Sequence, residues 1–217
     1  MAMVVESENT LTTIIGSEIT LASPTLNAAR VLRLDLGNLL AGDLVEIRLK
    51  SKVRTAGTVG DQYYMSYVGP VGNPIVETPP VSTDLGGTFT VRQVLGSVRT
   101  IDWKLLAFGS LVIESENTQA ATISTKHTLL APTTNKTRVL RVDLKNMAAG
   151  DCVALRVESK VRTAGTVRDQ YYQTFMNALG LSIVETVPIS LDLGGTFSLT
   201  QISGTGRSFD WKILTLD

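Results

Sequence analysis

The sequence predicts an all-β protein built from two tandem, homologous domains of the β-sandwich or jelly-roll-like class. Three observations predict it: a repeat that spans the chain, apolar residues that alternate with period two, and Gly- or Pro-containing turns between the alternating runs. A repeat of this length is a whole small domain, because solenoid units are only about 20 to 45 residues long.

The repeat runs from Val4 to Gly109 and aligns without a gap on Val112 to Asp217, so that each residue of the first copy has one counterpart in the second. About half of the aligned positions are identical. The best preserved segments are Glu6–Thr10 with Glu114–Thr118, Ser51–Val59 with Ser159–Val167, and Asp84–Phe89 with Asp192–Phe197. We therefore expect two domains, 1–109 and 110–217.

The clearest strand is expected from Leu44 to Arg54, where aliphatic residues alternate with charged ones. Because successive side chains of a strand point to opposite faces, one face should be core and the other charged. The residues expected in the two cores are Val45, Ile47, Leu49, Phe89, Val91, Trp103, Val153, Leu155, Val157, Phe197, Leu199 and Trp211.

Other strands of the first copy are expected near 10–15, 30–36, 63–67, 74–78, 88–94 and 101–107, with the same pattern in the second copy. Residues 37–43 should form a short helical turn or a loop, and Ala56-Gly57 should close a hairpin after the long strand. The last strand of the first copy is expected to end near Phe108 and the next to begin near Val112, which leaves almost no linker.

Composition argues against several classes of protein. The 20 basic and 20 acidic residues cancel, so no overall field favours nucleic acid or an anionic membrane. A single cysteine, Cys152, excludes an intrachain disulfide, and one histidine, His127, leaves few ligands for a structural zinc site. The N-terminus shows no signal peptide and no apolar run approaches about 20 residues, so we expect a soluble protein without a membrane partner.

The repeat argues against a catalytic role for the candidate residues. His127 aligns with Ile19 and Cys152 with Leu44, so the other copy holds an aliphatic residue at each position. The acid pairs Asp35 with Asp43 and Glu6 with Glu8 suit turn capping or solvation better than acid–base catalysis or calcium binding. Gly86-Gly87-Thr88 lacks the lysine and the helix of a phosphate-binding loop, and Trp103 and Trp211 suit core positions better than ligand stacking. We expect no enzyme, no cofactor and no metal.

A candidate binding surface is the basic strip of the long strand together with the Tyr-Tyr pair that follows the hairpin. Such a strip beside aromatic residues suits a protein interface, single-stranded nucleic acid or a plain solvated face, and the zero net charge disfavours nucleic acid. The candidate residues are Arg48, Lys52, Arg54, Gln62, Tyr63 and Tyr64, with Arg156, Lys160, Arg162, Gln170, Tyr171 and Tyr172 in the second copy.

The doubled β-sandwich pattern, with its Gly-Asp, Tyr-Tyr and Gly-Gly-Thr-Phe punctuation, resembles the small β-sandwich virion proteins of tailed bacteriophages that cement or decorate a capsid. The resemblance is architectural and covers the whole chain. It implies function by contact with the major capsid protein or another virion protein, a homo-oligomer, and a place in the virion after assembly in the host cytoplasm. The alternatives are a tandem carbohydrate-binding or adhesin module, a phage tail or baseplate component, and, least favoured, an enzyme.

Overall fold

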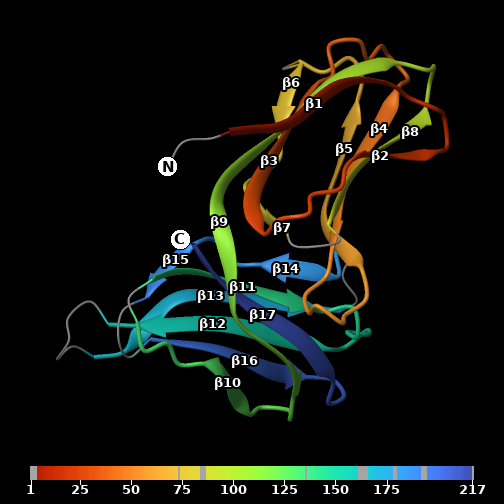
Figure 1. Ribbon diagram of the computed structural model, residues 1–217. Helices are drawn as coiled ribbons and strands as arrows, with labels where there is room; N and C mark the ends of the chain where they lie inside the picture. Colours follow the sequence, from red (N-terminus) through yellow and green to blue (C-terminus); the bar gives the residue numbers. More distant parts are fainter. Residues whose placement is uncertain are drawn as a thin grey trace. The chain divides into compact units, whose positions relative to one another are not determined.

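Antiparallel strands make up both parts of the protein in a computed structural model, which describes residues 4–72, 74–83, 87–134, 136–160, 166–177, 180–191 and 195–216 (Figure 1). The strands form layered sheets around apolar cores, which confirms the predicted all-β sandwich class. Contacts divide the chain into two units. The first contains the chain up to Lys52 and Val59–Leu111, and the second contains Val53–Thr58 and Val112–Leu216.

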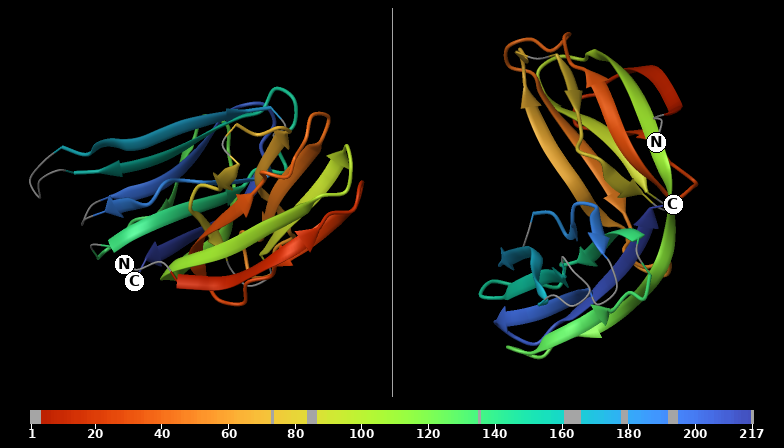
Figure 2. Two further views of the ribbon diagram at one scale, coloured as in Figure 1. Left: turned by 90° about the horizontal axis from the view of Figure 1, so that it is seen from above. Right: turned by 90° about the vertical axis from the view of Figure 1, so that its left-hand side faces the viewer.

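The first unit has two sheets. One has the strand order β2-β8-β4-β5, which can be followed in Figures 1 and 2. The other contains β1, the first part of β9, β3 and β6, and β7 pairs with β3. The strands are β1 (Val4–Thr12), β2 (Glu18–Ala22), β3 (Ala28–Asp35), β4 (Leu44–Ser51), β5 (Gly60–Val68), β6 (Ile75–Glu77), β7 (Val81–Thr83), β8 (Thr88–Leu95) and β9 (Thr100–Ala120).

The second unit has the same two kinds of sheet. One has the order β10-β16-β12-β13, and the other contains β14, β11, β17 and the second part of β9, with β15 paired to β11. The bounds of β2 to β8 correspond, position for position in the repeat, to those of β10 to β16. The strands are β10 (Lys126–Leu130), β11 (Lys136–Asp143), β12 (Cys152–Ser159), β13 (Arg168–Met176), β14 (Ile183–Glu185), β15 (Ile189–Leu191), β16 (Thr196–Ser203) and β17 (Ser208–Leu216).

Strict alternation builds each core. In β4, residues 45, 47 and 49 are buried against the facing sheet, and the charged residues between them lie on the outer face. All twelve residues expected in the cores are buried, including Trp103 and Trp211, so this prediction is confirmed. Burial of such large side chains supplies the stability of a fold without a disulfide.

The structure differs from the sequence-based strand assignment in several places. Strand β1 spans Val4–Thr12, whereas a strand was expected near 10–15, and β4 ends at Ser51 rather than at Arg54. The short strands β2 and β7 were not expected, because each is too brief for a clear period-two signal. Strand β9 runs without a break from Thr100 to Ala120, where we expected one strand to end and another to begin. Gly109 explains this continuity: its φ of 67° places it in the left-handed region, and it lies at the bulge where the register with β3 shifts.

Among the described residues, no helix has the length and apolar character needed to cross a membrane.

Candidate functional site

The outer face of the β2-β8-β4-β5 sheet presents an arginine stacked on a tyrosine. Arg48 of β4 and Tyr64 of β5 are opposite each other in the antiparallel register, so both side chains point to the same face. The Arg48 guanidinium lies 5.1 Å from the centroid of the Tyr64 ring. Arg48 also forms ion pairs with Glu46, at 3.0 Å, and Asp61, at 3.6 Å, which hold the guanidinium in place.

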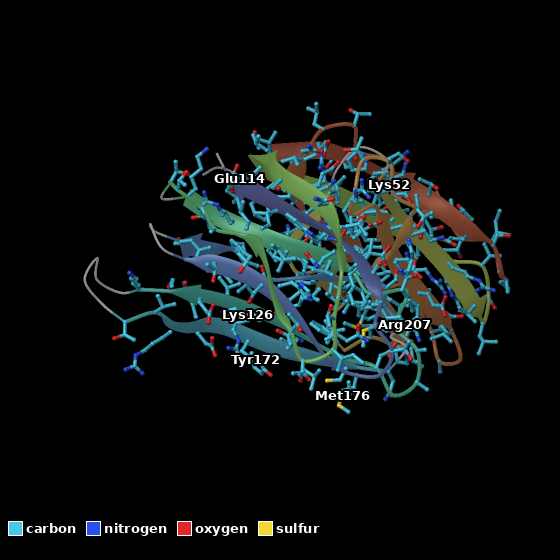
Figure 3. All side chains as sticks on the ribbon, turned by 90° about the horizontal axis from the view of Figure 1, so that it is seen from below. Lys52, Glu114, Lys126, Tyr172, Met176 and Arg207 are labelled. Carbon is cyan, nitrogen blue, oxygen red and sulfur yellow. The ribbon has the colours of Figure 1, made fainter. Side chains whose placement is uncertain are left out.

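The second unit repeats this arrangement on its β10-β16-β12-β13 sheet. Arg156 lies opposite Tyr172 in the register, and its guanidinium is again 5.1 Å from the ring centroid. Arg156 forms an ion pair of 3.4 Å with Asp169, which is the residue that aligns with Asp61 in the repeat. Figure 3 labels Tyr172 on the outer face of this sheet. The pair is therefore built twice from the same residue types and the same register.

The two arginine–tyrosine pairs differ in one electrostatic detail. The Tyr64 hydroxyl donates a hydrogen bond of 2.7 Å to Glu46, and this bond raises the pKa of Tyr64 above its ordinary value. Burial alone would raise the pKa of Glu46, but the hydrogen bonds from Tyr64 and Arg48 outweigh burial and lower it. The second unit has Ala154 at the position of Glu46, so Tyr172 has no equivalent acceptor there.

The two tyrosines of each Tyr-Tyr pair point in opposite directions, as strand alternation requires. Tyr63 packs against the core of the first unit, where burial raises its pKa to about 12, with a contribution from Tyr67. Tyr171 packs against the core of the second unit, and burial raises its pKa as well. Tyr64 and Tyr172 therefore form the outward half of the predicted surface.

Gln62 and Gln170 have an internal role in each unit. The Gln62 amide accepts from the Ser51 hydroxyl, at 2.7 Å, and donates to the Ser82 carbonyl, at 3.0 Å, which ties β4 and β5 to β7. Gln170 makes the same two bonds, to Ser159 at 2.8 Å and to Ser190 at 3.3 Å. These bonds give a structural reason for keeping glutamine in both copies.

The predicted basic strip is not one face of one strand, because β4 ends at Ser51 and the chain turns before Arg54. Lys52 and Lys160 directly follow β4 and β12, and Arg162 lies outside the described residues. Gly57 donates to the Arg54 carbonyl, at 2.8 Å, which closes the turn. Of the basic candidates that the structure describes, Arg48 and Arg156 are the ones placed on the outer sheet faces beside a tyrosine.

Arg54 instead belongs, with the rest of Val53–Thr58, to the second unit. Its guanidinium donates to the Thr118 hydroxyl, at 2.5 Å, and lies 3.6 Å from the Asp210 carboxylate. The neighbouring Thr55 amide lies 3.3 Å from both carboxylate oxygens of Glu116. The Val53–Thr58 turn therefore contacts one threonine and two carboxylates of the second unit.

A second surface, which the sequence analysis did not single out, is a pocket of about 410 Å³ on the outer face of the β1-β9-β3-β6 sheet. Two rows of outward residues cross it in register, Glu8 with Lys104 and Arg33, and Thr10 with Asp102 and Asp35. The signal in the sequence that could have indicated this surface is the repetition of Glu6–Thr10 and of the Asp-Trp-Lys triplet in the second copy.

Of the candidate catalytic groups, His127 has structural partners. The His127 ring accepts from the Thr122 amide, at 3.0 Å, and contacts Gln119 at its other nitrogen. Cys152 is half-buried at the start of β12. Over the described ranges, no group of three His, Cys, Asp or Glu side chains is arranged to hold a metal ion.

The candidate acid pairs separate into individual structural roles. Asp43 is buried and accepts from Arg99, at 2.6 Å, and from the Leu40 and Ser97 amides. Burial alone would raise its pKa, but these hydrogen bonds lower it to about 2. Glu6 forms a two-pronged ion pair with the buried Arg30. The expectation of structural roles for Asp43 and Glu6 is in line with these contacts.

Comparison with known proteins found no matching family model and no matching curated protein. Among solved structures, the PBSX exported protein XepA is 7% identical, with a TM-score of 0.35, over 100% of this chain and 86% of that chain. A chain from Sulfolobus Turreted Icosahedral Virus is 9% identical, with a TM-score of 0.34, over 99% of this chain and 90% of that chain. The tandem CBM22 domains of Xyn10C from Paenibacillus barcinonensis are 8% identical, with a TM-score of 0.28, over 98% of this chain and 90% of that chain. The likeness to these chains is loose, with TM-scores from 0.28 to 0.35.

Proposed function

We propose that this protein is a non-enzymatic structural component of a virion that acts by contact, as a cement or decoration protein that bridges capsid subunits. The observation that carries the proposal is the duplicated outward pair, Arg48 on Tyr64 and Arg156 on Tyr172, each with 5.1 Å between guanidinium and ring. The architectural resemblance of the sequence to phage virion proteins supplies the virion context.

Arginine and tyrosine suit a contact surface for physical reasons. Both are enriched among the residues that contribute most to protein–protein binding, because they combine a large contact area with directed hydrogen bonds. Stacking and ion pairs already restrict Arg48 and Arg156, so less side-chain entropy is lost when a partner binds. Each pair is a preorganised contact point.

Two similar contact points on one chain suit a partner that is itself repeated, such as the major capsid protein. Once one unit is bound, the other is held at a high effective concentration near the next subunit, so two modest contacts give a strong attachment. This is the physical basis for bridging. It requires no catalytic group, in keeping with the structural partners of His127 and Asp43.

A carbohydrate-binding or adhesin module is the second candidate, because Tyr64 and Tyr172 are exposed aromatic residues repeated in both units. A sugar stacks on an open aromatic face, and in both units a guanidinium lies over the ring. Trp103 and Trp211 are buried in the cores. These contacts favour a protein partner over a sugar.

The test is co-sedimentation of the protein with particles of virion size from its natural source, followed by rebinding of purified variants to stripped particles. We expect the parent to bind and the double variant Arg48→Ala with Arg156→Ala to bind roughly tenfold more weakly or worse. A protein that never travels with particles, or that is retained on a glycan array instead, overturns the proposal.

A matched control is Lys50→Ala with Lys126→Ala. It also removes one outer-face cation from each unit, but Lys50 and Lys126 occupy different positions of the repeat, so they are not part of a shared contact point. We expect this control to bind like the parent. Equal loss in the control and in the arginine variant would mean that total charge, rather than the arginine–tyrosine pair, drives binding, and would contradict the proposal.

A further inference from the structure

The pocket on the first unit corresponds residue by residue to the surface that binds the Val53–Thr58 turn in the second unit. Thr118, Asp210 and Glu116 hold Arg54 and Thr55 there. The repeat aligns these three residues with Thr10, Asp102 and Glu8, which all line the pocket of the first unit.

The carboxylates of this pocket have an electrostatic reason to bind a cation. Asp35 and Asp102 lie directly opposite each other in the β3–β9 register, and like charges at such positions repel. Within the described ranges Asp102 accepts from Thr10 and Asp35 from the Gly37 amide, and neither forms an ion pair. Two adjacent carboxylates therefore face the pocket without a neutralising side chain from these ranges.

The corresponding carboxylates of the second unit are neutralised. Asp143 lies opposite Asp210, Arg54 approaches Asp210 at 3.6 Å, and Lys145 contacts Asp143 at 3.0 Å. The first unit has Gly37 at the position of Lys145, so its carboxylates lack that cation as well.

Exposure shows the same contrast. The Lys104 side chain of the first unit is 38% exposed, while its counterpart Lys212 is 1% exposed. Likewise Glu8 is 60% exposed and Glu116 is 26% exposed. The pocket of the first unit is thus the open form of a surface that is covered in the second.

The chain contains a second copy of the sequence of the turn. Val161–Thr166 has the same residues, in the same order, as Val53–Thr58: Val-Arg-Thr-Ala-Gly-Thr. We propose that the Val161–Thr166 segment of one molecule binds the pocket of the first unit of a second molecule, with Arg162 on Asp102 and Thr10 and the Thr163 amide on Glu8. Such contact joins two different surfaces, so association is head-to-tail and leads to a closed ring or a filament.

The experiment measures self-association of the purified full chain by sedimentation velocity over a range of concentrations. We expect the parent to exceed its monomer mass of 23.3 kDa as concentration rises. Arg162→Asp and Asp102→Asn should each weaken association about tenfold or more, so that each variant stays monomeric at the concentrations where the parent associates. A matched control, Arg168→Ala, removes an exposed arginine of the same unit that has Gly60 at the aligned position, and it should associate like the parent.

The decisive step mixes the two monomeric variants. Asp102→Asn keeps the Val161–Thr166 sequence and alters the pocket, while Arg162→Asp keeps the pocket and alters that sequence, so together they should form a 1:1 complex that does not extend. This recovery also shows that both variants are folded. A monomeric parent at every concentration, or a mixture that stays monomeric while both variants melt like the parent, overturns the proposal. The measurement needs no virion, so its failure is distinguishable from failure of the proposed function.

Discussion

Glu18 and Lys50 form an ion pair of 2.7 Å on the outer face of the first unit, and the aligned residues of the second unit, Lys126 and Glu158, pair with the charges exchanged. The hydroxyl of Thr90 supports Glu18, and that of Thr196 supports Glu158. The two copies have therefore kept the interaction while reversing its direction, which marks it as a feature of the fold rather than of a shared contact surface.

The exchanged pair predicts the outcome of charge reversal. Glu18→Lys alone places two lysines together and should lower the free energy of unfolding by up to about 1 kcal/mol, since both side chains of the pair are partly exposed. Adding Lys50→Glu should restore it to within about 0.5 kcal/mol, as in the second unit. Urea unfolding measures both values. A double variant less stable than the single one would show that the surroundings fix the direction of the pair.

The buried carboxylate of Asp43 predicts a loss of stability in acid. Its pKa is about 2 in the folded protein and 3.8 ordinarily, so the folded state holds the charged form more tightly. The resulting stability is present above pH 3.8 and is lost as the pH falls toward 2. Asp43→Asn should be less stable than the parent at neutral pH, and its stability should fall less steeply over this interval. Parallel curves for the two proteins would contradict this assignment.

The tryptophan in the core of the first unit predicts a large effect of truncation. Trp103 is 9% exposed and packs with Leu34, Ile47 and Phe89 in one core cluster. Trp103→Ala should lower the free energy of unfolding by about 3 to 5 kcal/mol, because it leaves a cavity in a closely packed core. Thermal melting measures this loss. A melting profile unchanged by the substitution would place the indole in solvent and favour the ligand-stacking alternative.

The pair of Glu6 and Arg30 predicts a cost for removing one charge. Arg30 is 1% exposed and Glu6 is 29% exposed, and two hydrogen bonds join them across the β1 side of the sheet. Glu6→Gln leaves a buried guanidinium without its counter-charge and should cost about 2 to 3 kcal/mol. Glu114→Gln, at the aligned pair with Arg138, should cost a similar amount. Unfolding in guanidinium chloride measures both free energies, and a variant as stable as the parent would contradict the prediction.

Spacing along the chain was sufficient to assign the strand class and the inward faces, because alternation with period two is a local property of a strand. Val45, Ile47 and Leu49 could be placed in the core from their spacing alone. The sequence also indicated that the segment from Ser51 to Tyr64 carries more than turn geometry, since it returns nearly unchanged in the second copy.

Which of those repeated residues act together followed from the folded structure, because strand register and sheet order bring distant residues into contact. The fold separated Tyr63, which packs inward, from Tyr64, which meets Arg48, and it gave Gln62 an internal partner in Ser82. It also placed Asp35 opposite Asp102, far away in the sequence, across β3 and β9. No local pattern encodes that juxtaposition, since it depends on the pairing of strands whose order in the sheet differs from their order along the chain.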